Sequence, residues 1–216
     1  MIFIVAPNKI VLASKSAARR SILANFGIDA EIYVTDADET LYEHIDFAPW
    51  EIVTGLSQRK ARMAAEKMGD PHILVIAADT VVEFEGQIIG KPKNAGAAAE
   101  TLSKLSGKFH RVYSGITVVF GDKTACDYDM TKVKFKDISR REIEQYVKTG
   151  DPLAKAGSYG AEGPGSAFIE RIEGDFFNVA GLPVFKFAKI LTDSFGMTVF
   201  DLLPGHYAQE LPERIR

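Results

Sequence analysis

The sequence predicts a single α/β domain in which a mixed β-sheet is flanked by helices. Short apolar runs rich in β-branched residues occur between longer amphipathic segments with helical spacing. Two long alternating segments, at 109–120 and 123–136, are joined by a two-residue hairpin signal. Strands and helices do not alternate strictly, which favours a mixed sheet over a doubly wound parallel one. Without a repeat or a clear linker, we expect one domain over residues 1–205 and a loose tail over 206–216.

The composition is that of an ordinary soluble globular protein. The 216 residues are 46% hydrophobic and 25% charged, and the formal net charge of −3 argues against a broad basic face for nucleic acid. Cys126 is the single cysteine, which excludes an internal disulfide framework and suits a reducing compartment. No apolar run approaches the roughly 18 residues of a membrane span, and the N-terminus lacks the basic region of a signal peptide. We therefore expect a cytoplasmic protein that engages neither nucleic acid nor membrane.

The segment 73–92 contains the first candidate site residues. Its apolar run 73–78 predicts a buried strand, and Asp79 follows where that run stops. A hairpin turn at Glu85 then leads the chain back to Lys91. A carboxylate and an ammonium presented in this way would face one cleft. An edge carboxylate and a solvated turn lysine fit the same residues, and this segment alone does not separate the two interpretations.

A second candidate lies near the start of the chain. A strand at 10–13 runs through a hydroxyl-bearing turn into a helix that ends at Gly27. Such a junction gathers backbone N–H groups and the positive helix end, which favours an anion. Ser14 adds a hydroxyl group, and Arg19 adds a planar guanidinium suited to phosphate oxygens. The alternative is that Ser16 is a plain N-cap beside solvated arginines.

Two further segments carry charged candidates. In the helix predicted from Pro49 to about Met68, Lys60 lies near the apolar face and could lean toward a cleft, although a solvated basic face is the simpler interpretation. An acidic stretch that includes Glu39 follows a strand predicted at 31–34. Such clusters are commonly solvated loops and less often ligands of a hard cation such as Mg²⁺.

The rest of the chain adds regular elements and one glycine-rich loop. The loop from Ala156 to Gly165 has four glycines in nine residues, which let a backbone approach a ligand closely, although a plain flexible loop has the same composition. Further helices are predicted at 94–106, 139–150 and 183–195, and further strands at 168–172 and 197–203.

Together these segments resemble the Maf family of nucleoside triphosphate pyrophosphatases, also called septum formation proteins. The resemblance extends from Ile10 to Leu203 and rests on ordered motifs: LASKSAARRSIL, ADET, LSQRKA, AADTVV, GKP, SGKFHRVYSGITV, DPLAKAGSYGAEGPG and NVAGLPV. It implies an elongated α/β fold of two lobes with a cleft between them, similar to house-cleaning inosine triphosphate pyrophosphatases. It also implies hydrolysis between the α and β phosphates of a nucleotide, with a divalent cation, Mg²⁺ or Mn²⁺, as the cofactor.

The resemblance implies a role for each polar candidate. Asp79 matches the proton acceptor that activates water, and Glu39 matches the acidic position near the metal. The matches to phosphate-binding positions are Ser14, Arg19, Lys60 and Lys91. Cations there would stabilise the charge that develops on the leaving pyrophosphate. The residues do not decide whether Asp79 is the base or a metal ligand.

Three positions sort substrates in the family, and here they are Ala18, Thr80 and Glu162. Threonine resembles the dTTP/UTP pyrophosphatases, glutamate resembles the 7-methyl-GTP pyrophosphatases, and alanine replaces the larger side chain of both groups. An ionised Glu162 only accepts hydrogen bonds, so it suits guanine N–H groups and would repel O4 of uracil or thymine. This predicts relaxed or purine-tolerant specificity rather than a dedicated dTTP/UTP enzyme.

An alternative of another class is a nucleotide-binding regulatory protein of cell division without significant hydrolysis. The presence of Asp79, Glu39 and both lysines favours the enzyme. The physiological nucleotide, the preferred metal and the oligomeric state, a homodimer included, stay open at this point.

Overall fold

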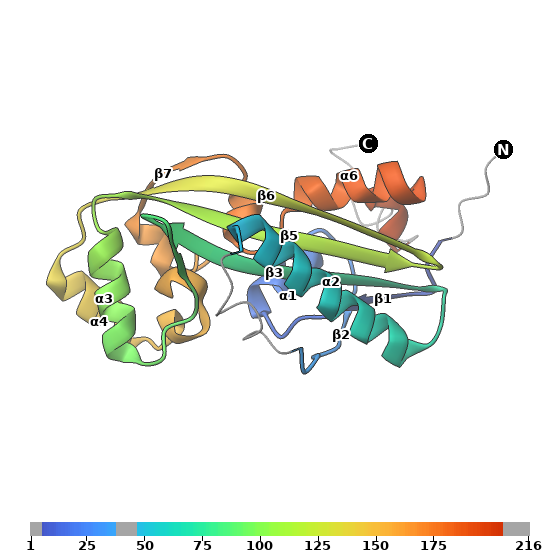
Figure 1. The fold of residues 1–216 in the computed structure, drawn as a ribbon, viewed down its shortest axis with the longest axis horizontal. Coiled ribbons are helices and arrows are strands. Elements are labelled where there is room, and N and C mark those ends of the chain that lie inside the picture. Colours follow the sequence, from blue (N-terminus) through green and yellow to red (C-terminus); the bar gives the residue numbers. More distant parts are fainter. Residues whose placement is uncertain (1–5, 38–46, 205–216) are drawn as a thin grey trace, which may run out of the picture.

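The molecule is elongated along three long strands, and helices α3 (Ala95–Leu105) and α4 (Arg140–Lys148) extend it beyond one end of them (Figure 1). The computed structural model describes residues 6–37 and 47–204, so Glu39 and the predicted tail at 206–216 lie outside the described residues. The three strands are antiparallel neighbours: β3 (Ile73–Phe84), β5 (Phe109–Phe120) and β6 (Lys123–Phe135).

These strands form the centre of a seven-stranded mixed sheet with the order β2-β1-β3-β5-β6-β7. Strand β1 (Lys9–Leu12) pairs in parallel with both β2 (Glu31–Ile32) and β3. Strand β4 (Gln87–Ile89) pairs antiparallel with β3, and β7 (Ile169–Glu173) pairs antiparallel with β6. The predicted mixed sheet is therefore confirmed, although the strand predicted at 31–34 is shorter than expected.

Helices cover both faces of the sheet and one of its ends (Figure 1). On one face, α2 (Pro49–Met68) packs against β3 and β5. The other face carries α1 (Ala17–Asn25), α5 (Phe176–Val179) and α6 (Val184–Phe195). Helices α3 and α4 pack together at the far end. Short 3₁₀ segments occupy Asp151–Ala154, Ala156–Ser158, Pro164–Phe168 and Val199–Leu202.

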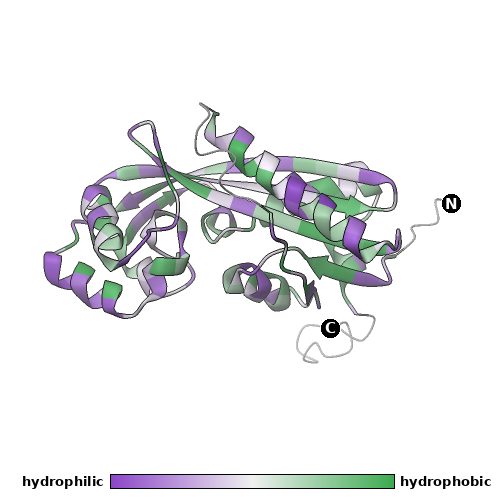
Figure 2. Ribbon diagram, turned by 60° about the horizontal axis from the view of Figure 1, so that its bottom comes forward, coloured by the Kyte–Doolittle hydropathy of each residue, from purple (hydrophilic) through white to green (hydrophobic). Residues whose placement is uncertain are grey.

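The sheet carries two main apolar cores that divide it lengthwise. Ile76 of β3 packs with Phe187 of α6 in one core, while Val82 of the same strand packs with Leu102 of α3 in the other. Figure 2 shows the outlying helices as mixtures of hydrophobic and hydrophilic residues, as amphipathic helices that pack on a sheet should be. Two lobes thus share one continuous sheet, and Asp79 lies on β3 where one core gives way to the other.

Local signals set most of the element boundaries. Asn94 accepts a hydrogen bond from the Ala97 N–H at the start of α3, and Ser139 forms a capping box with Glu142 at the start of α4. Gly69 ends α2 in the left-handed conformation. The helices predicted from these residues are confirmed.

The strand predicted at 197–203 is wrong. This segment contains the 3₁₀ helix Val199–Leu202, which begins at Thr198 with a side-chain hydrogen bond from its hydroxyl to Asp201. Met197 and Leu202 are buried in the α6 core, so the apolar pattern reflects packing against a helix and not membership of the sheet. The Thr-x-x-Asp spacing is a helix-start signal that would have corrected the prediction.

Candidate active site

Strand β3 changes its edge partner around Asp79. On one side it pairs with β1 over residues 73–76 and with β4 over residues 82–84. Its other side pairs continuously with β5 over residues 75–83. Within the described parts of the chain, residues 77–81 thus lie between two edge partners, in a gap of the sheet edge. Neighbouring side chains of a strand point to opposite faces of the sheet. The side chains of Asp79 and Thr80 therefore lie on opposite faces at this gap.

Asp79 faces helix α2 and forms an ion pair with Lys60. The Lys60 Nζ atom lies 2.6 Å from Asp79 Oδ1, and the two side chains are 9% and 11% exposed. Charges this well buried need a partner, because desolvation penalises an isolated ion by several kcal/mol. The solvated-face interpretation of Lys60 is therefore wrong. Lys60 sits on the buried side of α2, beside Ala61 and Ala64.

A glycine on β5 allows α2 to come this close. Gly115 is the register partner of Asp79, and a Cβ atom added to it would lie 2.3 Å from the carbonyl oxygen of Val53 on α2. Any side chain here would push the helix off the sheet and withdraw Lys60 from Asp79. The sequence reasoning gave Gly115 no role, although an isolated glycine inside a strand pattern often marks a close backbone approach.

On the opposite face, Arg19 ties three separate segments together. Its Nε donates to the Gly181 carbonyl at 2.7 Å, its Nη1 donates to Ser14 Oγ at 2.9 Å, and its Nη2 donates to Thr80 Oγ1 at 3.0 Å. Arg19 is only 9% exposed. The predicted candidates Ser14, Arg19 and Thr80 are thus brought together, and Ala18 lies buried beside them on α1.

The turn before α1 has the predicted form. Ser16 is the N-cap and accepts a hydrogen bond from the Arg19 N–H, and the Ser16 N–H donates to Ser14 Oγ at 3.2 Å. Ser14 is therefore held from two sides, at the positive end of a helix that begins at the gap.

Buried polar residues that the sequence analysis did not single out extend this network. Thr80 Oγ1 lies 2.8 Å from Ser114 Oγ, and the Ser114 hydroxyl donates to the Asn178 carbonyl at 2.9 Å. The Asn178 amide then donates to the Val112 carbonyl and to Thr131 Oγ1, both at 3.0 Å. Ser114 and Asn178 belong to motifs quoted for the resemblance, and that membership was the available signal.

The remaining candidates lie on the second lobe, the end of the molecule whose core contains Val82 and Leu102. Lys91 is exposed and follows β4, and the adjacent Gly90 carbonyl accepts a hydrogen bond from the Gly157 N–H at 3.1 Å. This bond fixes the glycine-rich loop 156–165 against the β3–β4 hairpin. Glu162 of that loop forms an ion pair with Lys155.

A divalent cation fits the described residues only in part. No group of three or more histidine, cysteine or acidic side chains gathers among residues 6–37 and 47–204. Mg²⁺ bound through substrate phosphates needs only one or two protein carboxylates. Asp79 offers one carboxylate at the gap, which suits an ion shared with substrate rather than one enclosed by protein.

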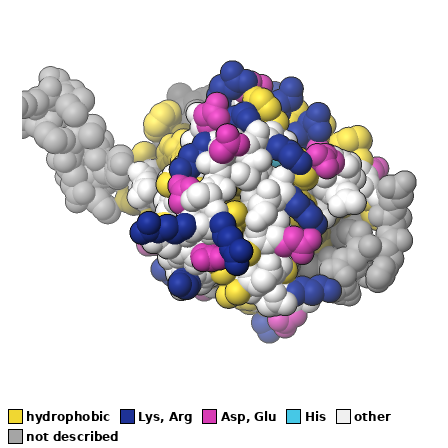
Figure 3. Space-filling model, turned by 90° about the vertical axis from the view of Figure 1, so that its left-hand side faces the viewer, with side chains coloured by type: hydrophobic (Ala, Val, Ile, Leu, Met, Phe, Trp, Pro, Cys, Tyr) yellow, Lys and Arg dark blue, Asp and Glu magenta, His cyan; other side chains and the backbone are white. Residues whose placement is uncertain are grey.

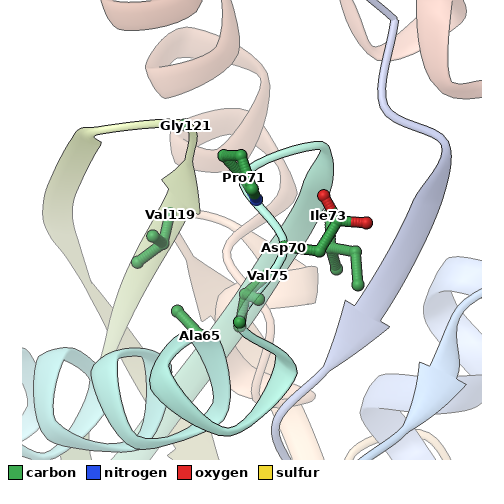
Figure 4. Close-up of a pocket in the computed structure, with 8 residues that line it drawn as sticks. Ala65, Asp70, Pro71, Ile73, Val75, Val119 and Gly121 are labelled. Atoms are coloured by element: carbon green, nitrogen blue, oxygen red, sulfur yellow. The ribbon is translucent and has the colours of Figure 1, made fainter.

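Other surface features lie away from this gap. A hollow of about 160 Å³ lies at the N-terminal end of β3, where Ala65, Asp70 and Val119 line it (Figure 4). On the end of the molecule formed by the second lobe, basic and acidic side chains are intermixed (Figure 3). Among the described residues, none of the helices has the length and apolarity to cross a membrane.

The charged groups gathered at the gap suit an enzyme that acts on phosphate anhydrides, and the comparisons agree. The chain is 43% identical over 183 residues to dTTP/UTP pyrophosphatases of Bacillus cereus (strain AH820) and Bacillus anthracis, covering 85% of this chain and 94% of each relative. The model of the family described as Maf-like protein matches residues 9–194. The chain belongs to this family, and the predicted class, nucleoside triphosphate pyrophosphatase, is that of its relatives.

One solved structure is also similar, a nucleoside-triphosphatase/dITP/XTP pyrophosphatase from Mycobacterium abscessus. It is 18% identical, covers 59% of this chain and 72% of its own, and superposes with a TM-score of 0.35.

Proposed function

We propose that this chain hydrolyses nucleoside triphosphates between the α and β phosphates and releases a nucleoside monophosphate and pyrophosphate. The observation that carries the proposal is the buried Lys60–Asp79 pair at the gap in the sheet edge, next to the Ser14–Arg19–Thr80 chain. Its relatives, the dTTP/UTP pyrophosphatases, support the same reaction class.

In this proposal Asp79 orients the attacking water and takes its proton. The contact with Lys60 fixes the orientation of the carboxylate, and a general base must be held within hydrogen-bond reach of the proton that it removes. An ammonium group has three donor hydrogens, so contact with Asp79 is compatible with contact to a phosphate oxygen.

The cations and the α1 N-terminus would bind the phosphates. Ser14 lies at the positive helix end, and Arg19 holds its hydroxyl in place. The described hydrogen bonds of Arg19 go to protein acceptors, so its proposed contribution to phosphate binding is partly positional, through Ser14 and Thr80. Lys91 would approach the phosphates from the second lobe. Together these charges would stabilise the negative charge that develops on the leaving pyrophosphate.

A divalent cation, Mg²⁺ or Mn²⁺, completes the proposal. Glu39, outside the described residues, would hold it together with substrate phosphates. When bound, such an ion neutralises phosphate charge and polarises the phosphoryl oxygens. A cytoplasmic location and a homodimer are also part of the proposal, and cell fractionation and light scattering would test them.

The decisive test measures pyrophosphate release from canonical and modified nucleoside triphosphates with Mg²⁺ or Mn²⁺, and again with excess chelator. We expect stoichiometric pyrophosphate and monophosphate, no turnover in chelator, and recovery when the metal is restored. Release of orthophosphate instead of pyrophosphate would overturn the assigned bond, and binding without turnover would favour a nucleotide-binding regulator. Full activity in chelator would remove the metal from the proposal.

A further inference from the structure

A buried serine of β5 lies behind the contacts of Arg19. Ser114 is the register partner of Thr80 and is fully buried, so water cannot replace its hydrogen bonds. Its Oγ atom lies 2.8 Å from Thr80 Oγ1 and 2.9 Å from the carbonyl oxygen of Asn178. Thr80 Oγ1 in turn accepts a hydrogen bond from Arg19 Nη2 at 3.0 Å. Ser114 thus connects α5 to the guanidinium at the gap.

The two ends of this chain of hydrogen bonds fix its direction. A carbonyl oxygen only accepts, so the proton between Ser114 and Asn178 belongs to the Ser114 hydroxyl. A hydroxyl has one proton, so the contact between Ser114 and Thr80 uses the proton of Thr80. The guanidinium only donates, and Thr80 is its acceptor. The donors therefore all point one way, from Arg19 to the Asn178 carbonyl.

The segment that ends the chain also holds Arg19 directly. The side-chain amide of Asn178 ties this segment to β5 and β6 through two hydrogen bonds of 3.0 Å. Three residues later, the Gly181 carbonyl accepts from Arg19 Nε at 2.7 Å. Gly181 has a φ of 101°, which suits glycine, and a Cβ atom there would lie 3.4 Å from Thr80 Oγ1. Two contacts of the guanidinium are therefore set from 178–181, one directly and one through Ser114.

The third contact of the guanidinium is with Ser14. Ser14 Oγ accepts from Arg19 Nη1 at 2.9 Å and from the Ser16 N–H at 3.2 Å. Both lone pairs of the hydroxyl oxygen are then occupied, so its hydrogen is left to donate. No described residue accepts that hydrogen, although Ser14 is only 7% exposed. A nearly buried donor in this state suits an oxygen atom of a phosphate.

We infer that Ser114 is a positioning residue for phosphate binding. Through Thr80 it fixes the guanidinium of Arg19, and the guanidinium holds the Ser14 hydroxyl with its hydrogen available to the phosphates. The inference rests on the proposed function, in which Ser14 binds phosphate, and adds a residue that is too deeply buried to touch substrate. Without the Ser114 oxygen, the Thr80 hydroxyl would turn to the Gly181 carbonyl, 3.5 Å away, and compete there with Arg19 Nε. The guanidinium would then lose its fixed orientation.

Ser114→Ala and Ser57→Ala form a matched pair of variants. Ser57 of α2 is also fully buried, donates to the Thr54 carbonyl at 3.0 Å and lies 2.9 Å from Thr117 Oγ1, but it is on the opposite face of the sheet from Arg19. Ser114→Ala should raise KM about tenfold and change kcat by less than about threefold, because the misplaced phosphate contact is made in both ground and transition state. Ser57→Ala loses the same kinds of bond and should leave KM unchanged. Equal KM values for the two variants would overturn the inference.

Inorganic tripolyphosphate tests the phosphate contact without a base or sugar. Its Kd, measured by calorimetry with Mg²⁺, should rise by about the same factor as KM in Ser114→Ala. Ser14→Ala should also weaken binding, and Ser114→Ala combined with Ser14→Ala should bind as Ser14→Ala does, because the two residues act through one donor. Multiplied effects in the double variant, or a wild type that does not bind tripolyphosphate, would overturn the inference. If wild type binds tripolyphosphate but hydrolyses no nucleotide, the proposed function fails and these Kd values still decide the role of Ser114.

Ser114→Cys decides the case in which Ser114→Ala does not fold. A thiol fills most of the same space but is a weak donor and a weak acceptor, so KM and the tripolyphosphate Kd should rise at least about threefold. Wild-type values of both constants in folded Ser114→Cys would then overturn the inference.

Discussion

The Lys60 ammonium lies 2.6 Å from Oδ1 of Asp79, at a position where both side chains are about one-tenth exposed. Removing one member of such a pair takes an opposite charge away from the other buried group, which is destabilising. A single substitution therefore changes the chemistry and the stability together, and only a combination of variants distinguishes the two effects.

Asp79→Asn should lower turnover by at least about 10²-fold if Asp79 is the base. It should also lower the free energy of unfolding, by up to roughly 3–5 kcal/mol, because Lys60 keeps its charge. Steady-state pyrophosphate release and urea denaturation measure the two quantities. Lys60→Met combined with Asp79→Asn should recover much of the stability and none of the activity. Near-wild-type turnover in Asp79→Asn would remove Asp79 from the role of base.

Arg19→Lys should impair both stability and turnover, because one ammonium cannot reproduce three divergent N–H contacts to Gly181, Ser14 and Thr80. Each buried acceptor left without its donor costs about 1–3 kcal/mol. Arg20→Lys, at the exposed neighbour, is the control and should change the free energy of unfolding by less than about 0.5 kcal/mol. Equal unfolding midpoints for the two variants would show that the Arg19 contacts contribute little.

Gly115→Ala should lower activity more than other glycine substitutions, because its methyl group would meet the Val53 carbonyl and displace α2. Lys60 would then move relative to Asp79. Gly163→Ala is a suitable control, since a Cβ atom there meets no heavy atom within 4 Å. The measurement is kcat at saturating nucleotide beside the free energy of unfolding. Wild-type kcat in Gly115→Ala would mean that the close approach of α2 does not determine the position of Lys60 relative to Asp79.

Local rules predicted most of the elements but less of the site. Helix α2 and the β5–β6 hairpin follow from caps, turn residues and periodicity, which are all short-range. Asp79 was found because it ends an apolar run. The role of Lys60 was left undecided, because the sequence of one helical turn does not show that a glycine on β5 allows α2 to pack close to the sheet. Glu162 was named from the resemblance, whereas its contact with Lys155 was not predicted, because that contact depends on how the glycine-rich loop folds.

Lys91→Ala should weaken nucleotide binding, with a larger effect at low salt than at high salt, because screening reduces the contribution of an exposed charge. The measurement is KM, or the Kd of a non-hydrolysable analogue, at about 0.01 M and 1 M ionic strength, where the Debye length falls from about 30 Å to about 3 Å. Lys93→Ala, two residues further and also exposed, is the matched control. Identical behaviour of the two variants would assign Lys91 to the solvated surface.

His110 should make the protein less stable in mild acid. Its Nε2 lies 2.8 Å from the Tyr159 hydroxyl, the residue is 2% exposed, and burial lowers the pKa of its imidazole from 6.5 to about 4. Above pH 6.5 the ring is neutral in both the folded and the unfolded chain, so it adds no pH dependence. Between pH 6.5 and 4 the unfolded chain binds a proton that the folded chain does not, and stability falls as the pH falls.

The difference between those pKa values corresponds to roughly 3 kcal/mol in the free energy of unfolding, lost over this range and constant below it. Urea denaturation at pH 7 and pH 4.5 measures it as the change in wild type minus the change in His110→Gln, which cancels groups common to both. His72→Gln, at an exposed histidine, should behave like wild type. If His110→Gln loses as much stability in acid as wild type does, the imidazole is not the group whose protonation the fold resists.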